Sequence, residues 1–328
     1  MKYRTFGKTG WKVSEVGLGT WALGGDEWGD VDENQALEVI DEATNQGINF
    51  IDTADVYGDG TSEKRIAKAI KQTDERIYIA TKFGRRLDPH TSAGYTKENL
   101  ERFLDRSLEN LEVSTIDLVQ LHCPPTDVYY RPEIFEAMED FVEQGKIRYY
   151  GVSVEKVEEG LKAIEYPGLA SVQIIFNIFR QRPAELFFDQ CKKKDVAIIA
   201  RVPLASGLLT GKFTKDTQFP ENDHRNFNRN GEAFDVGETF AGVDFETGLE
   251  AVEQVEDLRP EGFTSAQFAL KWILEHNEIS IVIPGAKNRK QVRDNAQTSD
   301  LPGLKSGTME ETRNIYEKLI KQQVHQRW

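Results

Sequence analysis

The sequence is poor in the features that secreted and membrane proteins need. Only two of its 328 residues are cysteine, Cys123 and Cys191, and they form no CxxC pair. A disulfide framework is therefore excluded, which is typical of proteins in a reducing cytoplasm. No apolar run approaches the roughly 20 residues of a transmembrane helix, and the opening stretch, MKYRTFGKTGW, has no apolar signal core. We therefore expect a cytoplasmic protein.

Basic residues are also in deficit, because 41 Lys and Arg stand against 55 Asp and Glu and leave a formal net charge of −14. An acidic surface repels nucleic acid and anionic lipid, so we expect neither nucleic acid nor a membrane as a partner. The sequence also has no cluster of residues at the spacing typical of metal ligands, so no metal is expected. We place four histidines at the surface or in loops: His90, His224, His276 and His325.

The chain does contain a regular alternation of strand-like and helix-like segments. The helix-like segments carry apolar residues at helical spacing, as Leu100, Phe103 and Leu104 do after the expected N-cap Thr96. The strand-like runs are rich in Ile and Val and nearly continuous, which indicates strands that are buried on both faces. Eight such runs are present, at 15–20, 48–53, 76–82, 116–122, 147–153, 171–177, 196–202 and 279–285.

Eight strand–helix units without a linker predict one (β/α)8 barrel, a TIM barrel, that spans residues 1–328 as a single domain. The alternative is a doubly wound open sheet. The stretch GLGTWA at 17–22 is a weak dinucleotide fingerprint, because no helix begins directly after it. Residues 3–14 predict an N-terminal β-hairpin that plugs the bottom of the barrel. Residues 205–245, after the seventh strand, predict a long, polar, irregular loop, and a final helix is expected over 308–323.

Polar side chains stand at the ends of three neighbouring strands. Asp52 ends the second strand, Lys82 the third and His122 the fourth, and Tyr57 lies in the loop after Asp52. Because the C-terminal strand ends of such a barrel meet at one mouth, these four side chains are expected in one pocket. Each residue taken alone also fits a structural role, such as a cap or a rim aromatic. The combination is what indicates catalysis.

The four residue types suit proton transfer at a carbonyl oxygen. The ordinary pKa of tyrosine is about 10, and the Lys82 cation would lower it while Asp52 keeps that lysine charged. His122 can donate a hydrogen bond that orients the oxygen. No side chain supplies the hydride that carbonyl reduction also requires, so a nicotinamide cofactor is implied.

Motifs over nearly the whole chain resemble those of the aldo-keto reductase superfamily. They are, in order, GLGTW, FIDTADVYG, ATKFG, DLVQLH, GKIRYYGVS, QIIFN, PLASGLLTGKF and IPGAKNRKQVRDN. Within the superfamily the chain looks closest to a bacterial branch of general-stress and inositol-type reductases, which is related to potassium channel β subunits. The resemblance implies an NADPH-dependent enzyme that reduces small aldehydes or ketones, with Tyr57 as the general acid. A weakly catalytic cofactor-binding subunit is the alternative, which the complete set of four residues disfavours.

The resemblance also implies which residues bind NADPH. Lys287 and Arg289, at a helix N-terminus after the eighth strand, are expected to contact the 2′-phosphate, so that NADPH is preferred over NADH. Lys290 is expected to face solvent. Arg225 either clamps the cofactor phosphates or only solubilises its loop. The full set of predicted cofactor residues is Thr20, Trp21, Asp52, Ser153, Gln173, Arg201, Val202, Pro203, Leu204, Ala205, Ser206, Gly207, Leu208, Lys212, Arg225, Pro284, Gly285, Ala286, Lys287, Arg289, Gln291 and Asn295.

Two positions depart from the family pattern. Val154 stands where asparagine often follows serine, and Arg201 stands where many members carry an aromatic side chain that stacks on the nicotinamide. The loops at the mouth predict an aromatic substrate pocket built from Trp21, Trp28 and Tyr129. We expect a monomer or a weak homo-oligomer.

Overall fold

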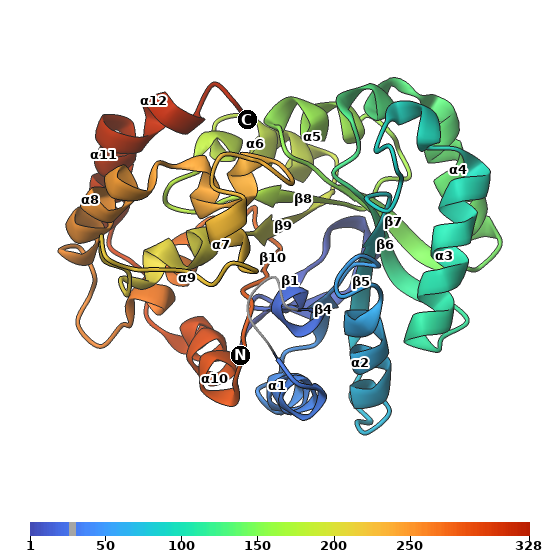
Figure 1. Cartoon of the computed structure of the whole chain (residues 1–328), viewed down its shortest axis with the longest axis horizontal. Helices are drawn as coiled ribbons and strands as arrows, with labels where there is room; N and C mark the ends of the chain where they lie inside the picture. Colours follow the sequence, from blue (N-terminus) through green and yellow to red (C-terminus); the bar gives the residue numbers. More distant parts are fainter. Residues whose placement is uncertain (26–30) are drawn as a thin grey trace.

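A computed structural model describes residues 1–25 and 31–328, and its centre is a barrel of parallel strands (Figure 1). Each strand from β3 to β10 pairs with the next in sequence, and parallel bridges between Val16 and Val282 and between Gly19 and Gly285 join β10 to β3. The predicted (β/α)8 barrel is therefore confirmed, and an open sheet is excluded. The strands are β3 (Leu18–Gly19), β4 (Phe50–Asp52), β5 (Tyr78–Phe83), β6 (Ile116–His122), β7 (Ile147–Ser153), β8 (Ser171–Ile175), β9 (Ala197–Arg201) and β10 (Ile281–Val282).

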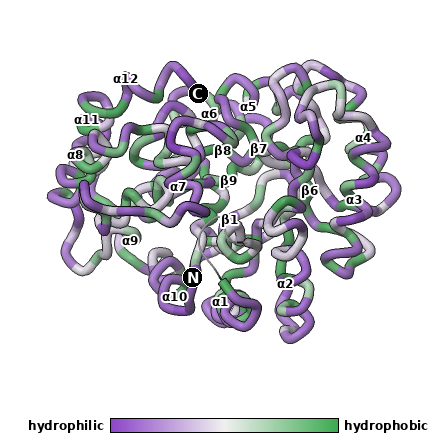
Figure 2. The backbone as a smooth tube through the Cα atoms, in the orientation of Figure 1, coloured by the Kyte–Doolittle hydropathy of each residue, from purple (hydrophilic) through white to green (hydrophobic). Residues whose placement is uncertain are grey.

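Helices surround the barrel because the segment after each strand carries an apolar stripe that packs on the sheet. In α3, Leu100 and Leu104 are fully buried, and the hydroxyl of the N-cap Thr96 accepts a hydrogen bond from the Asn99 amide at 3.3 Å. Figure 2 shows hydrophobic residues concentrated towards the strands and hydrophilic ones along the outer helices. The helices of the ring are α1 (Glu33–Asn45), α2 (Thr61–Ile70), α3 (Lys97–Leu111), α4 (Pro132–Glu143), α5 (Val157–Ala163), α6 (Phe187–Lys193), α9 (Ser265–Leu274) and α10 (Arg289–Gln297).

The N-terminal hairpin closes the lower end of the barrel, as predicted. Its strands β1 (Tyr3–Thr5) and β2 (Lys12–Ser14) pair antiparallel. Phe6 is fully buried between them, and its ring lies 5.4 Å from that of Phe50 at the start of β4. Because this end is plugged by apolar side chains, a ligand can enter only from the end where the strands finish.

The segment after β9 is less irregular than its polar sequence predicts. It contains the short helix α7 (His224–Phe227) and leads into α8 (Phe245–Glu256). Four of its phenylalanine rings contact one another and pack into or against the main hydrophobic core: Phe213, Phe219, Phe240 and Phe245. These apolar contacts anchor the segment, which positions its polar residues over the mouth of the barrel.

One of the histidines expected at the surface or in loops differs from that expectation: His224 is fully buried in α7, and its ring stacks on Trp21 with centroids 4.9 Å apart. His276 lies in the loop after α9, as expected, and packs between Trp272 and Phe176 at centroid distances of 4.7 and 4.9 Å. Burial lowers the pKa of His224 to about 4, so the ring is neutral at pH 7. Among the described residues, no three His, Cys, Asp or Glu side chains are arranged to hold a metal ion.

The chain ends in helices that pack outside the barrel. The helix expected over 308–323 is present as α11 (Ser306–Ile315), which continues through a wider turn at Tyr316–Ile320 into α12 (Lys321–Val324). Within residues 1–25 and 31–328, no helix combines the length and the apolar composition that crossing a bilayer requires.

Candidate active site

The ends of β4 and β5 bring together a buried ion pair. The Nζ atom of Lys82 lies 2.5 Å from Oδ1 of Asp52 and 2.8 Å from the carbonyl oxygen of Thr53. Asp52 and Lys82 are 3% and 1% exposed. Burial opposes the charge on Lys82, but Asp52 and Tyr57 raise its pKa above the ordinary value. Lys82 is therefore a fixed cation inside the barrel.

The second oxygen of Asp52 is held by two glutamine amides. Gln173 on β8 donates to Oδ2 at 2.7 Å, and Gln120 on β6 donates to the same atom at 3.3 Å. A buried carboxylate needs such donors to offset its lost hydration. Gln173 was predicted as a contact of the nicotinamide, and here its amide is oriented by the ion pair.

Tyr57 reaches this ion pair from the loop after β4. Its hydroxyl lies 3.5 Å from Lys82 Nζ, and its ring centroid is 5.1 Å from the same atom. Glycine is required next to it, because a Cβ on Gly58 would lie 1.5 Å from the carbonyl oxygen of Gly24. The Gly-rich turn in DVYGDG thus lets the loop pack closely and aim Tyr57 into the barrel mouth.

Burial and the ion pair act on the Tyr57 hydroxyl in opposite directions. Burial raises the pKa of Tyr57, and the Lys82 cation opposes that increase. The sequence predicted the second effect but not that burial would be the larger one. Tyr57 is therefore protonated at neutral pH, and its phenolate, once formed, has a cation beside it.

His122 faces Tyr57 from the end of β6, with ring centroids 6.0 Å apart. The side chain is buried, and this burial lowers its pKa well below the ordinary value, with Arg85, Lys82 and Arg201 adding to the decrease. The imidazole is therefore neutral at pH 7. Its Nδ1 atom is buried and has no hydrogen-bond partner in the described part of the chain.

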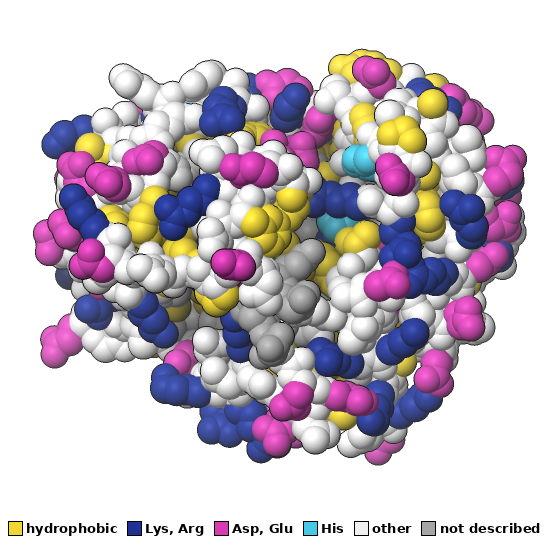
Figure 3. Space-filling view, in the orientation of Figure 1, with side chains coloured by type: hydrophobic (Ala, Val, Ile, Leu, Met, Phe, Trp, Pro, Cys, Tyr) yellow, Lys and Arg dark blue, Asp and Glu magenta, His cyan; other side chains and the backbone are white. Residues whose placement is uncertain are grey.

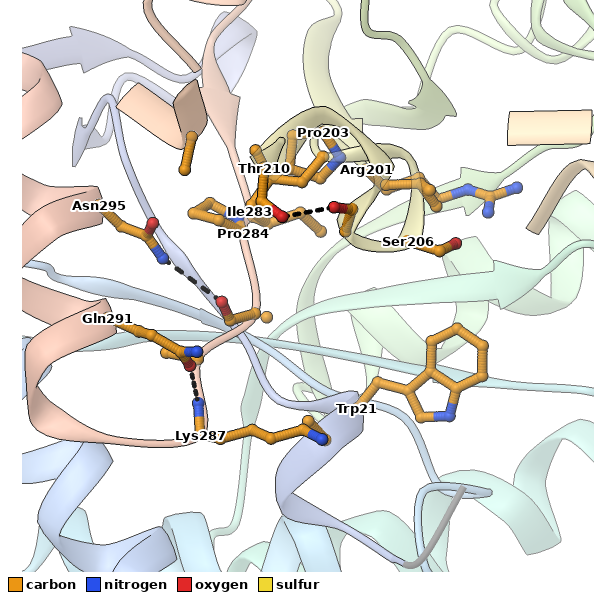
Figure 4. Close-up of a pocket in the computed structure, with 18 of the residues that line it drawn as sticks. Trp21, Arg201, Pro203, Ser206, Thr210, Ile283, Pro284, Lys287, Gln291 and Asn295 are labelled. Carbon is orange, nitrogen blue, oxygen red and sulfur yellow. Dashed lines mark hydrogen bonds between the residues drawn. The ribbon is translucent and has the colours of Figure 1, made fainter. Parts of the chain in front are cut away.

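One cavity of about 730 Å³ connects these residues to α10 (Figure 4). Its size and mixed polar and apolar walls are those of a cofactor site. Figure 4 shows Lys287, Gln291 and Asn295 on one side of it and Arg201 and Ser206 on the other. The predicted residues that line the cavity are Thr20, Trp21, Asp52, Tyr57, His122, Ser153, Gln173, Arg201, Val202, Pro203, Leu204, Ser206, Gly207, Lys212, Arg225, Pro284, Gly285, Ala286, Lys287, Gln291 and Asn295.

Four predicted residues do not line the cavity. Lys82 lies behind Tyr57, and Ala205 and Leu208 are fully buried in the turn below. Arg289 lies outside the cavity, and its side chain turns towards α1 and lies 3.5 Å from Glu38.

The expected aromatic substrate pocket is present only in part. Trp21 lines the cavity, and its ring lies 6.0 Å from that of Tyr57. Tyr129 is fully buried outside the cavity, with its hydroxyl 3.4 Å from the carbonyl oxygen of Ser153. Trp28 lies outside the described residues.

The charged residues of the cavity wall that the sequence analysis did not assign to the site are Arg85, Glu238, Arg259, Lys290 and Asp294. Glu238 Oε2 lies 2.5 Å from Arg201 Nη1, which explains how a guanidinium is kept at the end of β9. Arg85 follows Lys82 closely, so its position just after a strand end was an available signal. Glu238 lies inside the long segment after β9, where no periodicity marks single residues. Figure 3 shows basic and histidine side chains gathered in the hollow on this face.

Asp55, between Asp52 and Tyr57, is fully buried, and neither of its carboxylate oxygens has a hydrogen-bond partner in the described chain. Burial and the nearby Glu63 raise its pKa from 3.8 to about 7. The unfolded chain therefore loses this proton first, and the protein loses stability as the pH rises from about 4 to about 7. A carboxylate whose pKa is lowered on folding has the opposite effect, because its contribution to stability is lost as the pH falls.

Asp55→Asn should therefore stabilise the protein at pH 8 by about 2–4 kcal/mol, because the amide cannot ionise. The gain should shrink to near zero at pH 4. Urea unfolding of both proteins at the two pH values measures it. Asp59→Asn is the control, because arginine hydrogen bonds lower the pKa of Asp59 and reverse the sign of the effect. An Asp55→Asn gain that is equal at both pH values would contradict the assignment.

The known proteins that this chain resembles in sequence and in structure belong to one family. The aldo/keto reductase family model matches residues 15–317. Aldo-keto reductase YhdN from Bacillus subtilis is 33% identical over 299 residues, which cover 89% of this chain and 87% of that protein. An NADP(+) aldo-keto reductase, yakc, from Schizosaccharomyces pombe is 29% identical and covers 86% and 83%. The structure of glycerol dehydrogenase from Gluconobacter oxydans superimposes with a TM-score of 0.79 at 29% identity, covering 97% and 96%.

The predicted relation to channel subunits is confirmed as well. A probable voltage-gated potassium channel β subunit from Arabidopsis thaliana is 26% identical over 92% of each chain. Because the family model covers most of the sequence and the barrel matches solved members, the chain belongs to the aldo/keto reductase family of oxidoreductases.

Proposed function

We propose that the protein uses NADPH to reduce aldehydes or ketones to alcohols, with Tyr57 as the proton donor. The observation that carries this proposal is the chain of contacts from Asp52 through Lys82 to the Tyr57 hydroxyl, at 2.5 and 3.5 Å, inside one cavity with His122. A binding subunit without catalysis has no need of a buried cation beside a buried phenol, whose cost in desolvation is high.

Each residue has a role at the carbonyl oxygen. NADPH, when bound, supplies the hydride to the carbonyl carbon. Tyr57 donates its proton to the oxygen, and the Lys82 cation stabilises the phenolate that remains. Asp52 keeps Lys82 charged, and neutral His122 donates a hydrogen bond that orients the same oxygen.

The cavity beyond Tyr57 fits the charges of the cofactor. Lys212, Arg225 and Lys287 all line it. Burial lowers the pKa of Lys287, and the neighbouring Arg225 lowers it further. Two cations held this close are stabilised when a phosphate lies between them.

A spectrophotometric assay of NADPH oxidation with 4-nitrobenzaldehyde tests the proposal. Many turnovers per protein molecule are expected, since this neutral aldehyde needs no specific pocket. A protein that binds NADPH but completes no more than one turnover with any aldehyde or ketone of a broad panel would instead be a cofactor-binding subunit.

Cofactor choice should depend on Lys287 and not on Arg289. A charge-assisted hydrogen bond contributes about 1.5–3 kcal/mol, so the 2′-phosphate should make NADPH bind at least ~10-fold more tightly than NADH. Lys287→Ala should weaken NADPH by ~10-fold and leave NADH almost unchanged. Arg289→Ala is the matched control, because its side chain lies against Glu38. Titration of protein fluorescence measures the affinities of the three proteins for both cofactors, and equal binding of both cofactors by the unmodified protein would refute the assignment.

A further inference from the structure

A buried network of charges stands beside the catalytic residues and is not needed for the reduction itself. Arg85, in the loop after β5, and Arg201, at the end of β9, both contact Glu238, with N–O distances of 3.5 and 2.5 Å. Glu155, after β7, lies 3.2 Å from Arg85. The side chains of Arg201 and Glu238 are each 7% exposed. Four charged groups from separate segments thus meet in the wall around the cavity.

The charges in this network do not balance at neutral pH. Burial opposes the ionisation of Glu238, but Arg201 and Arg85 hold its pKa below the ordinary value, so it carries a full negative charge. Burial and the nearby Asp235 raise the pKa of Glu155 to about 7, so this carboxyl is only partly ionised. Within these four groups, two guanidiniums therefore face one full and one partial negative charge, and the neighbouring Asp235 lies near a third guanidinium, that of Arg180. A buried excess of positive charge is costly unless an anion offsets it.

Arg85 is the guanidinium that still has hydrogen-bond donors to offer to a ligand. Both of its contacts are made by Nη2, to Glu155 and Glu238, and within the described residues no protein acceptor lies on its Nε or Nη1. Arg85 lines the same cavity as Tyr57 and His122. Arg201, by contrast, is engaged by Glu238 and by a hydrogen bond to the Val154 carbonyl at 2.9 Å, and its remaining nitrogen, Nε, has no partner in the described chain but is buried away from a ligand. A planar guanidinium with two unused donor sites suits a carboxylate.

We propose that Arg85 is a specificity residue that binds a carboxylate carried by the substrate, so that the enzyme prefers oxo acids over neutral aldehydes and ketones. The inference rests on the proposed reductase function. The substrate carboxylate takes the Nε and Nη1 donors of Arg85, while the carbonyl lies at Tyr57 and His122. Glu155 competes with the substrate carboxylate for the same guanidinium and so limits the preference for oxo acids.

The test compares 4-carboxybenzaldehyde with its methyl ester, because the two substrates share the reacting group and differ in one charge. The unmodified protein should show a kcat/KM at least ~10-fold higher for the acid. Arg85→Gln should lower kcat/KM for the acid by about 10- to 100-fold and leave the ester nearly unchanged. Glu155→Gln should increase the preference, since it removes the competing carboxylate. Arg86→Gln is the matched control, because Arg86 pairs with Asp59 outside the cavity.

The outcomes separate this inference from the function on which it rests. Reduction of both substrates without a preference, or an equal loss for both in Arg85→Gln, would refute the role of Arg85 and leave the reductase function standing. A second measurement does not need turnover: binding of the acid and the ester to NADPH-loaded Tyr57→Phe protein, with and without Arg85→Gln. A loss of about tenfold or more for the acid alone supports the inference, and no difference between the two proteins overturns it.

Discussion

Replacing Tyr57 with phenylalanine should lower kcat at least ~100-fold, the usual scale for the loss of a general acid. The phenol is the group in the cavity whose proton can pass to a carbonyl oxygen at neutral pH, because burial raises its pKa and neutral His122 holds no second proton to give. Stopped-flow and steady-state assays with one aldehyde give kcat. NADPH affinity should remain nearly unchanged, because the ring and its packing against Trp21 are kept.

Tyr150→Phe is the matched control for this variant. Tyr150 is also buried, but its hydroxyl donates to Glu139 at 3.0 Å, and neither residue lines the cavity. This change should leave kcat nearly unchanged. A Tyr57→Phe enzyme whose turnover stays within about threefold of the unmodified protein would remove Tyr57 from the chemistry, because losing a general acid costs much more than this.

The barrel was predictable because buried parallel strands leave a strong trace in the sequence. Nearly continuous Ile- and Val-rich runs identified every strand, but not its length. The run expected over 279–285 forms a ladder only at Ile281–Val282, since the barrel closes there by single bridges next to Gly19. Apolar runs report burial on both faces, and hydrogen-bond pairing is decided by curvature and closure, which periodicity does not encode.

The candidate site was predictable where a strand end fixes a side chain or where a sequence motif resembles the family. Asp52, Lys82 and His122 meet because the barrel brings neighbouring strand ends together. Arg289 lies outside the cavity because a position at a helix N-terminus does not set the rotation of the helix, and α10 packs with this residue towards α1. Glu238 was not predicted because its partners, Arg85 and Arg201, come from two distant segments whose meeting depends on tertiary packing.

Loss of the Lys82 cation should be almost as damaging as loss of the Tyr57 hydroxyl. Lys82→Met removes the charge that opposes the raised pKa of Tyr57, so that pKa should rise further. Two consequences follow: kcat should fall by at least ~100-fold, and the alkaline limb of the pH–rate profile should move to higher pH. Profiles of kcat for aldehyde reduction and for alcohol oxidation, measured over the same pH range, report the shift from both directions.

Misfolding is the competing explanation for such a loss, and a double variant separates the two. Lys82→Met alone leaves Asp52 buried without its cation, which costs about 3–5 kcal/mol of stability. Adding Asp52→Asn removes that uncompensated charge, and the amide can still pair with Gln173 and Gln120. The double variant should therefore regain most of the unfolding free energy while kcat stays low, since the phenolate still lacks its cation. Recovery of full activity together with stability, or an unshifted pH profile, would show that Lys82 only fills space in the barrel.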